Sequence, residues 1–337
     1  MTLLSDPVSW NLIRENAVPS GVAPLVAFIA RPHLASAEQR WCDKVLTQSW
    51  ARHEQSLYHL NDALGILEDE GIRALALKGP VLARRCYDPP FLRKPPIDLD
   101  LAIDRRDLDR ACEAFMREGF VLDEPVRRAK MLSHHAVLTH ASRPRIELHF
   151  RLSHRSAGIP VDEFFGRAQP HALPGGRVAW VLAPADEALH LILHAVSDRF
   201  ATLFHLYEVR RIWLGMPLDV RRETLRRGID YHFAGALKMV DVAFRSLWGD
   251  GLLPPDFPVP GTWLHWQLNE KLLRSFEDWW GPDPPLRLMD GLWGRWLDFQ
   301  TTDRPVDAAK FAANIALTAW FQAARRGRAG PSGLHIP

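Results

Sequence analysis

The stretch LALKGPVLARRCYDPPFLRKPPIDLDLAI (residues 75–103) holds two short apolar segments on either side of a glycine turn, a basic segment and a proline-rich loop. The segment IRALALK (72–78) is short and alternating enough to be a β-strand. Gly79 and Pro80 follow it, and because proline is well placed in a first helical turn, VLARRCY is expected to be a helix. The loop DPPFLRKPP leads into IDLDLAI (97–103), a second strand. The fold prediction starts from this order of strand, turn, helix and strand.

Helical and strand patterns continue on both sides. Before the stretch, leucines spaced by three or four residues over 57–67 share one face of a helix. After it, RRDLDRACEAFMREGF is expected to be a helix, and MLSHHAVLTHA (131–141) and RIELHFRL (145–152) to be the two strands of a hairpin. From residue 184 the pattern is helical. We therefore predict an α+β protein, a mixed sheet with flanking helices followed by a mainly α-helical C-terminal region.

Two carboxylates lie on the second predicted strand. Asp98 and Asp100 project to the same side of it, while Ile97, Leu99 and Leu101 are expected to point into the core. Like charges held this close repel each other unless a cation or a proton lies between them. Hard oxygen ligands favour magnesium or manganese, so the pair is predicted to be a divalent-metal site.

The same spacing recurs at Asp107 and Asp109, but on a predicted helix. There the two side chains are about 200° apart around the helix axis and cannot share a metal ion. A metal site is therefore predicted at Asp98 and Asp100 because they lie on a strand, and not because of the Asp-x-Asp spacing alone.

A third carboxylate comes from RIELHF. If Ile146, Leu148 and Phe150 face inward, Glu147, His149 and Arg151 lie on the polar face of the strand.

If this strand pairs beside IDLDLAI, Glu147 lies next to the aspartates, and three acidic groups can hold two divalent ions for phosphoryl or nucleotidyl displacement. A glycine turn that opens a helix presents backbone N–H groups to phosphate, so Lys78 and Gly79 are predicted to bind phosphate, with Arg93 as a clamp.

These motifs resemble a bacterial nucleotidyltransferase-like family of the polymerase-β-type superfamily, whose members carry a Lys-Gly turn, an arginine before Asp-x-Asp and a later Glu-x-His strand. The resemblance covers about residues 55 to 215. It implies a metal-dependent nucleotidyltransferase, with Asp98, Asp100 and Glu147 as metal ligands and with Lys78, Gly79, Arg93 and His149 at the nucleotide. Glu147 is also a candidate base. Glu208 stands where the family is expected to have an aspartate.

The resemblance implies the substrates and the domains as well. The enzyme would move an NMP from an NTP, ATP in the first place, to an unidentified acceptor, with two Mg²⁺ or Mn²⁺ ions and release of pyrophosphate. The predicted boundaries are 1–70 for an N-terminal helical segment, 71–183 for the nucleotidyltransferase-like catalytic core and 184–337 for a helical C-terminal domain.

The composition limits the classes of partner that the protein is expected to bind. The formal net charge is only +2 with 24% charged residues, which argues against nucleic acid and a membrane surface. No apolar run reaches the roughly 18 residues that a membrane span needs. The first residues lack the pattern of a secretory signal, and the three cysteines fit a reducing compartment, so a cytoplasmic protein is expected.

Other interpretations stay open. The acidic cluster could be structural, with Lys78 and Arg93 as its ion-pair partners, in a non-catalytic nucleotide-binding or regulatory protein. A phosphotransferase is the third alternative, although the sequence has no Walker-type motif.

The remaining histidines and aromatic residues are given structural roles. His190 and His194 have the spacing of a zinc pair, but they lack the glutamate of HExxH and an evident third ligand, so core roles are favoured. Tryptophan pairs between residues 263 and 296 are also interpreted as core. The stretch 311–328 has an apolar stripe followed by arginines, which the helix dipole favours at a helix end, so an ordinary helix is preferred to one that docks a partner.

Overall fold

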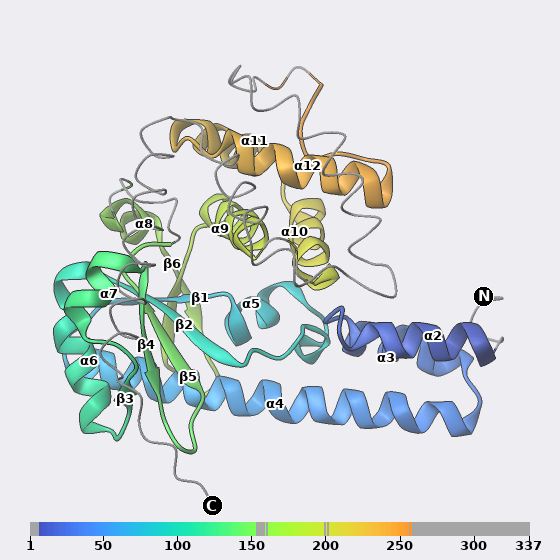
Figure 1. The fold of residues 1–337 in the computed structure, drawn as a ribbon, viewed down its shortest axis with the longest axis horizontal. Helices are drawn as coiled ribbons and strands as arrows, with labels where there is room; N and C mark the ends of the chain where they lie inside the picture. The colour runs from blue at the N-terminus through green and yellow to red at the C-terminus, as the bar shows by residue number, and fades with distance from the viewer. Residues whose placement is uncertain are drawn as a thin grey trace, which may run out of the picture.

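A seven-stranded mixed sheet is the centre of the computed structural model (Figure 1), with the strand order β3-β4-β5-β2-β1-β7-β6. The structure describes residues 7–152, 161–198 and 202–255 and the single residues 159, 200 and 257. The strands are β1 (Ala74–Leu77), β2 (Asp98–Ile103), β3 (Val121–Leu122), β4 (His135–Thr139), β5 (Arg145–His149), β6 (Gln169–Ala172) and β7 (Val178–Val181).

Helices precede, interrupt and follow the sheet. The α-helices are α2 (Pro7–Ala17), α3 (Ala23–Ala30), α4 (Ser36–Asp69), α5 (Gly79–Cys86), α6 (Leu108–Arg117), α7 (Val126–Leu132), α8 (Val161–Arg167), α9 (Pro184–Ser197), α10 (Leu203–Gly215), α11 (Leu218–Asp230) and α12 (Ala234–Trp248). Short 3₁₀ helices are η1 (Arg31–His33), η2 (Pro90–Leu92) and η3 (Arg105–Asp107). The α+β prediction, with helices following the sheet, is confirmed.

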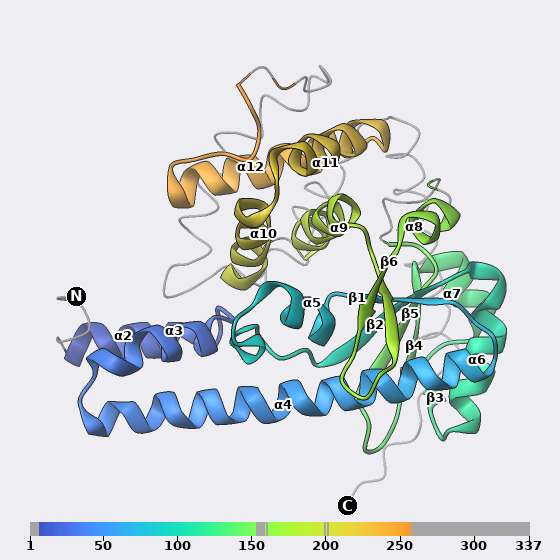
Figure 2. The same ribbon diagram turned by 180° about the vertical axis from the view of Figure 1, so that it is seen from behind.

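One face of the sheet is covered by α4 and α6. The long helix α4 runs along the bottom of Figure 1 and is seen from behind in Figure 2. Its leucines, such as Leu60 and Leu67, pack against Leu101 of β2 and Leu148 of β5, as the leucine spacing predicted. Burying these side chains contributes roughly 1.5–3 kcal/mol each. The helix gives way to β1 at Gly71, whose φ of +67° suits glycine.

The opposite face of the sheet is turned toward α8 to α12. Leu75, Leu77 and Ala102 form a small core with Phe164 of α8. Beyond it, α9 is surrounded by α10, α11 and α12, which lie at the top of Figure 1. Because β-strand side chains alternate, every residue of β2 that does not face α4 must face these helices.

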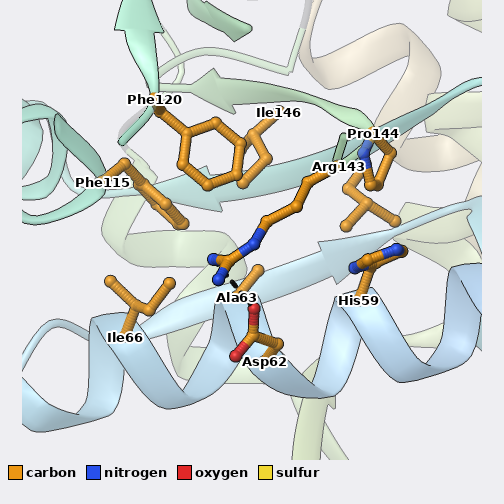
Figure 3. A pocket seen from close by; sticks show the side chains of 10 residues that line it. His59, Asp62, Ala63, Ile66, Phe115, Phe120, Arg143, Pro144 and Ile146 are labelled. Carbon is orange, nitrogen blue, oxygen red and sulfur yellow. Dashed lines mark ion pairs between the residues drawn. The ribbon is translucent and has the colours of Figure 1, made fainter. Parts of the chain in front are cut away.

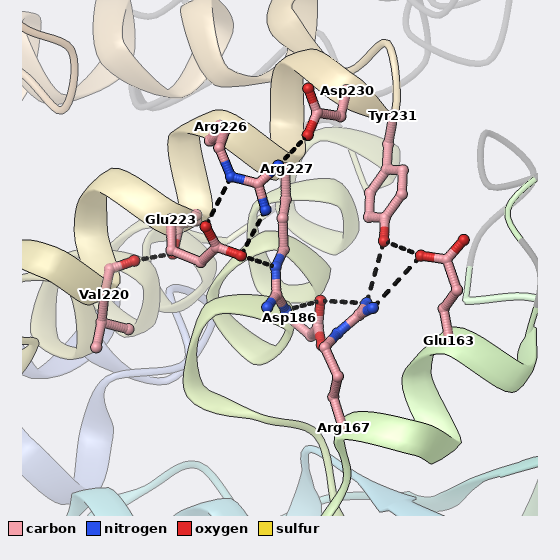
Figure 4. Close-up of polar contacts among 10 residues, drawn as sticks. Glu163, Arg167, Asp186, Val220, Glu223, Arg226, Arg227, Asp230 and Tyr231 are labelled. Atoms are coloured by element: carbon pink, nitrogen blue, oxygen red, sulfur yellow. Dashed lines mark hydrogen bonds and ion pairs between the residues drawn. The ribbon is translucent and has the colours of Figure 1, made fainter.

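A buried acidic side chain joins three of these helices (Figure 4). Asp186 of α9 is 1% exposed and accepts hydrogen bonds from Arg167 of α8 at 2.9 and 3.1 Å. Arg227 of α11 lies 2.6 Å from the same carboxylate. Tyr231 accepts from Arg167 at 3.1 Å and donates to Glu163 at 2.6 Å. This network fixes the position of α9, because a buried carboxylate needs all of its partners.

The loop between β4 and β5 is anchored on α4 (Figure 3). Arg143 reaches into a small recess lined mostly by apolar side chains, and its guanidinium lies 3.2 Å from Asp62 of α4. The same guanidinium lies 5.8 Å from the centre of the Phe120 ring. The anchor fixes the end of the hairpin from which β5 starts.

Several local predictions are corrected. The hairpin is confirmed, but its first strand begins only at His135, because Met131 and Leu132 belong to α7. Ile97 is 80% exposed and does not point into the core. It lies before the first residue of β2, so the alternation that buries Leu99 and Leu101 does not extend to it.

Within the described residues, no helix is long and apolar enough to cross a membrane. The tryptophan pairs and the apolar stripe near the C-terminus lie outside these residues. The predicted domain boundaries stay a prediction.

Candidate active site

The site starts where β1 ends and β2 begins. The two strands are antiparallel, with Leu77 opposite Asp100, so the turn that follows β1 lies beside the first carboxylates of β2. Lys78 in this turn has a φ of +48° and Gly79 a φ of +56°. Glycine adopts such a conformation freely, whereas a side chain at Lys78 strains the backbone, as is common at functional sites.

The three predicted carboxylates lie on one face of the sheet. β2 and β5 are parallel, and Asp98 pairs with Arg145 and Asp100 with Glu147. Because side chains alternate along both strands, Asp98, Asp100 and Glu147 share the face opposite α4, and Leu99 is buried on the other side. The predicted strand neighbours are therefore confirmed.

Basic side chains balance this acidic cluster. Lys78 Nζ lies 3.0 Å from Asp100. Arg145 Nη2 lies 3.0 Å from Asp98 and 2.7 Å from Glu147. The Lys78 pair matches the structural interpretation of the cluster, but its arginine partner is Arg145 and not Arg93, which pairs with Glu208.

His149 connects two of the carboxylates. Its Nε2 is 2.9 Å from Asp100 and 3.6 Å from Glu147, and the residue is only 4% exposed. His135 of the neighbouring strand lies 3.9 Å from Glu147. By contrast, His140 packs on the Phe120 ring at 4.9 Å, away from the cluster.

The ionisation of the cluster follows from burial and charge together. Burial alone would raise the pKa of Asp100, but Lys78 and His149 outweigh it and hold this pKa well below its ordinary value. Burial raises the pKa of Asp98, and the charge of Asp100 raises it further. Burial would lower the pKa of His149, but the carboxylates beside it raise it. For Glu147, burial would raise the pKa, but His149 and His135 together outweigh it and lower the pKa.

The donor atoms present fit a hard divalent cation. Asp100, Glu147 and His149 each place one possible ligand atom within 4.8 Å of the others, and Asp98 lies on the same face. Carboxylate oxygens are the ligands that Mg²⁺ and Mn²⁺ prefer. Asp107 and Asp109 on η3 and α6, in contrast, pair separately with Arg110 and Lys130.

Arg93, predicted as a phosphate clamp, is engaged by a buried carboxylate. Its Nε and Nη2 donate to the two oxygens of Glu208 at 2.6 and 3.0 Å. Arg93 is 6% exposed and Glu208 is 2% exposed. The neighbouring Lys94 has its Nζ 6.0 Å from the centre of the Phe204 ring. Lys94 and Arg93 both line a cleft in front of the acidic cluster.

A second group of polar side chains lies across the cleft. His194 and Asp198 are one helical turn apart at the end of α9, and His205 comes from the first turn of α10. Burial lowers the pKa of His205 to about 4 and that of His194 well below its ordinary value. Burial also raises the pKa of Asp198 to about 6.

The cleft between these groups has a volume of about 340 Å³. We define the sheet wall as Lys78, Gly79, Asp98, Asp100, Arg145 and Glu147, and the helix wall as His194, Asp198, Phe204, His205 and Glu208, all of which line it.

The structure thus gathers the predicted residues. Of the seven predicted site residues, His149 alone does not line the cleft, and it contacts Asp100 and Glu147 from behind. Lys94, Arg145 and the helix wall were missed as site residues. His190, which was given a core role, is buried with neither ring nitrogen hydrogen-bonded, and burial lowers its pKa to about 3.

A mixed sheet that carries an acidic strand pair beside a lysine-glycine turn defines the class of nucleotidyltransferases that the sequence predicted. The model of the family described as "Uncharacterised nucleotidyltransferase" matches residues 7–235, more than half of the chain. The protein belongs to this family. The match confirms the predicted resemblance and extends beyond residues 55 to 215 at both ends.

Among solved structures, the chain is similar to the solution structure of the antibiotic-resistance factor ANT(2'')-Ia. The sequence identity is 11% and the TM-score 0.39, with 52% of this chain and 92% of that chain covered. No curated protein matches the chain.

Proposed function

We propose that this nucleotidyltransferase moves an NMP from an NTP, with ATP as the first candidate, to an acceptor hydroxyl or similar group in a reaction that depends on Mg²⁺ or Mn²⁺. The observation that carries the proposal is the register of β2 and β5, which aligns Asp100 with Glu147 beside the Lys78–Gly79 turn. Three carboxylates at the edge of a cleft, next to a phosphate-binding turn, are the parts that nucleotide transfer requires.

Asp98, Asp100 and Glu147 would hold the divalent ions, which would neutralise charge on the phosphates and orient the reacting oxygens. Lys78 and the backbone N–H groups at the start of α5 would bind the phosphates. His149 would keep Asp100 oriented through their 2.9 Å hydrogen bond and would lie beside Glu147 at 3.6 Å.

In this reaction the acceptor oxygen forms a bond to the α-phosphorus, and the bond from the α-phosphorus to the β-phosphate oxygen breaks. Pyrophosphate leaves with that electron pair. The acceptor proton goes to Glu147, which its lowered pKa keeps ionised. Catalysis would rest mainly on positioning and on charge neutralisation.

A non-catalytic nucleotide-binding protein is the second candidate, and one observation favours it. Lys78 lies 3.0 Å from Asp100, and Arg145 pairs with both Asp98 and Glu147. The cluster is therefore balanced by the chain's own cations. A binding protein on the same fold would bind NTP but transfer nothing.

The deciding experiment is calorimetric titration of ATP with and without Mg²⁺. The native chain is compared with Asp98→Asn/Asp100→Asn and with Asp107→Asn/Asp109→Asn, which has the same spacing on a helix. We expect Mg²⁺-dependent binding in the native chain and the helix control, and its loss in the strand variant. If the well-folded native chain binds no NTP with Mg²⁺ or Mn²⁺, the proposal is wrong.

Labelled nucleotide then separates the candidate reactions. Transfer of label from α-labelled ATP to an acceptor, with release of pyrophosphate, supports a nucleotidyltransferase. Transfer from γ-labelled ATP alone indicates a phosphotransferase, and binding without transfer of either label to any acceptor indicates the regulatory alternative.

We also propose that the enzyme acts in the cytoplasm. Cys42, Cys86 and Cys112 are all free thiols, which fits a reducing compartment. The low net charge supports an acceptor other than nucleic acid.

A further inference from the structure

The helix wall contains a compact group of three possible metal ligands. His194 Nδ1 lies 3.3 Å from Asp198 Oδ2, and His205 Nε2 lies 3.6 Å from the same oxygen. All three donor atoms lie within 4.8 Å of one another. The group has no part in the transfer proposed above.

These separations suit a shared metal ion. Metal bonds of about 2.0–2.1 Å at tetrahedral angles place neighbouring donors about 3.3–3.4 Å apart. Hydrogen bonds from N–H to oxygen are shorter, at about 2.7–3.2 Å. The contacts of Asp198 with His194 and His205 are both longer than that, and both are close to the tetrahedral separation.

The local fold explains why the three residues meet. His194 and Asp198 are four residues apart across the end of α9, so they point to the same side. A short connection leads to α10, whose first turn carries His205 toward them. Asp186 anchors the other end of α9 through Arg167 and Arg227, so the helix that provides two of the ligands has a fixed position.

The ligand set differs from that of the sheet wall. Two imidazole nitrogens and one carboxylate oxygen favour a borderline cation such as Zn²⁺, whereas three carboxylates favour Mg²⁺. Three protein ligands leave a fourth tetrahedral position, as in catalytic zinc sites. His194, Asp198 and His205 all line the cleft, so an exchangeable ligand can reach them from it.

We propose that His194, Asp198 and His205 form a second metal site, on the helix wall of the cleft, for a borderline divalent cation such as Zn²⁺. The site takes the metal independently of nucleotide.

Cobalt is the probe, because tetrahedral Co²⁺ absorbs visible light and reports its own coordination. The titration uses full-length Asp98→Asn/Asp100→Asn protein, in which the carboxylate site is weakened. We expect one equivalent of Co²⁺ to bind with the absorption of a tetrahedral site, and Zn²⁺ to displace it. In the same background, His194→Gln/His205→Gln should abolish the absorption.

Two further variants make the result specific. Asp198→Asn should weaken Co²⁺ binding by more than the 10- to 100-fold typical of losing a partner outside the ligand shell. His33→Gln removes an exposed histidine on η1 and should change nothing. Circular dichroism spectra of all variants establish that they fold.

Two outcomes would overturn the proposal. The first is Co²⁺ binding that is unchanged by His194→Gln/His205→Gln. The second is Co²⁺ binding that is present in the native chain but lost in Asp98→Asn/Asp100→Asn, which would assign the metal to the sheet wall. Neither outcome depends on nucleotide transfer, so failure here is distinct from failure of the proposed function.

Discussion

The two walls of the cleft are built in different ways. The sheet wall takes Asp100 and Glu147 from neighbouring strands in register, where the position of each side chain follows from the one two residues before it. The helix wall takes His194 and His205 from two helices, where the position depends on how α9 and α10 pack. Local sequence pattern therefore determines the first wall and tertiary packing the second.

The walls also differ in how their charges are balanced. Each carboxylate of the sheet wall contacts a lysine, arginine or histidine at 3.0 Å or less. Asp198 of the helix wall contacts only histidines, at 3.3 and 3.6 Å, among the residues that the structure describes. In the sheet wall a metal ion would have to displace Lys78 or Arg145 from the carboxylates, whereas Asp198 of the helix wall has no lysine or arginine partner among the described residues.

The largest expected change in stability comes from removing the ion pair that links the two sides of the cleft. Arg93 precedes β2 and Glu208 belongs to α10, so their buried ion pair joins the two. Arg93→Met leaves Glu208 as an uncompensated buried charge and should lower the free energy of unfolding by about 3–5 kcal/mol. Urea denaturation measures this loss.

Two controls accompany this prediction. Adding Glu208→Leu should recover most of the lost stability, because both charges are then absent. Arg31→Met breaks the exposed pair with Asp43 and should cost less than about 1 kcal/mol. An equally small loss in Arg93→Met would mean that the buried pair does not hold the walls together.

The second expected effect concerns acid stability. His190 lies in α9 beneath the helix wall, and burial lowers its pKa to about 3. Between the ordinary value near 6.5 and this pKa, the unfolded chain binds a proton that the folded chain does not. Folding therefore loses stability as pH falls, by about 2 kcal/mol between pH 7 and pH 5.

His190→Leu should remove this part of the pH dependence, while His33→Leu should leave it intact. Urea denaturation at pH 7 and pH 5, in buffer with a chelator, measures the difference. Parallel pH profiles of the native chain and His190→Leu would contradict the assigned pKa.

A third, smaller effect tests the turn on the sheet wall. Lys78 has a φ of +48°, which a side chain adopts at a cost. Lys78→Gly and Lys78→Ala both lose the contact with Asp100, so they differ in backbone strain and in the entropy of the unfolded chain, and strain is the larger at this positive φ. Lys78→Gly should be the more stable by about 1 kcal/mol in urea. A more stable Lys78→Ala would show that the turn is unstrained.

The smallest effect compares the two Asp-x-Asp pairs. Burial and the charge of Asp100 raise the pKa of Asp98, so its ionised form is unfavourable in the fold. Asp98→Asn should raise stability in chelator by up to about 1 kcal/mol. Asp107→Asn loses the pair with Arg110 and should lower stability by no more than about 1 kcal/mol. If the melting temperatures of Asp98→Asn and Asp107→Asn shift in the same direction, the two Asp-x-Asp pairs do not differ in this way.

Sequence pattern predicted the sheet wall well, because strand periodicity is local. The burial of Leu99 and Leu101 places Asp98 and Asp100 on the other face, and the pairing of β2 with β5 followed the same logic. The prediction was wrong for Ile97, because alternation applies only inside a strand.

The helix wall could not be predicted in this way. His194 was considered as a zinc ligand and set aside for want of a third partner, which His205 and Asp198 now provide. The sequence could have indicated Asp198 as a second ligand, since it follows His194 by four residues and so lies on the same side of the helix. The position of His205, however, depends on how α10 packs. Likewise, Arg93 was predicted to contact phosphate or the acidic cluster, and its partner Glu208 could not be predicted because it lies 115 residues away.

The parallel pairing of β2 and β5 bears on how the family can vary in length. Parallel neighbours cannot be joined by a tight turn, so residues 104–144 cross over the sheet before β5 begins. Insertions in the exposed loops of that crossover would leave the register of Asp100 and Glu147 unchanged. A single-residue deletion inside β5 would turn Glu147 to the wrong face. Length changes in those exposed loops should therefore be tolerated, whereas the five residues of β5 cannot change in number without moving Glu147.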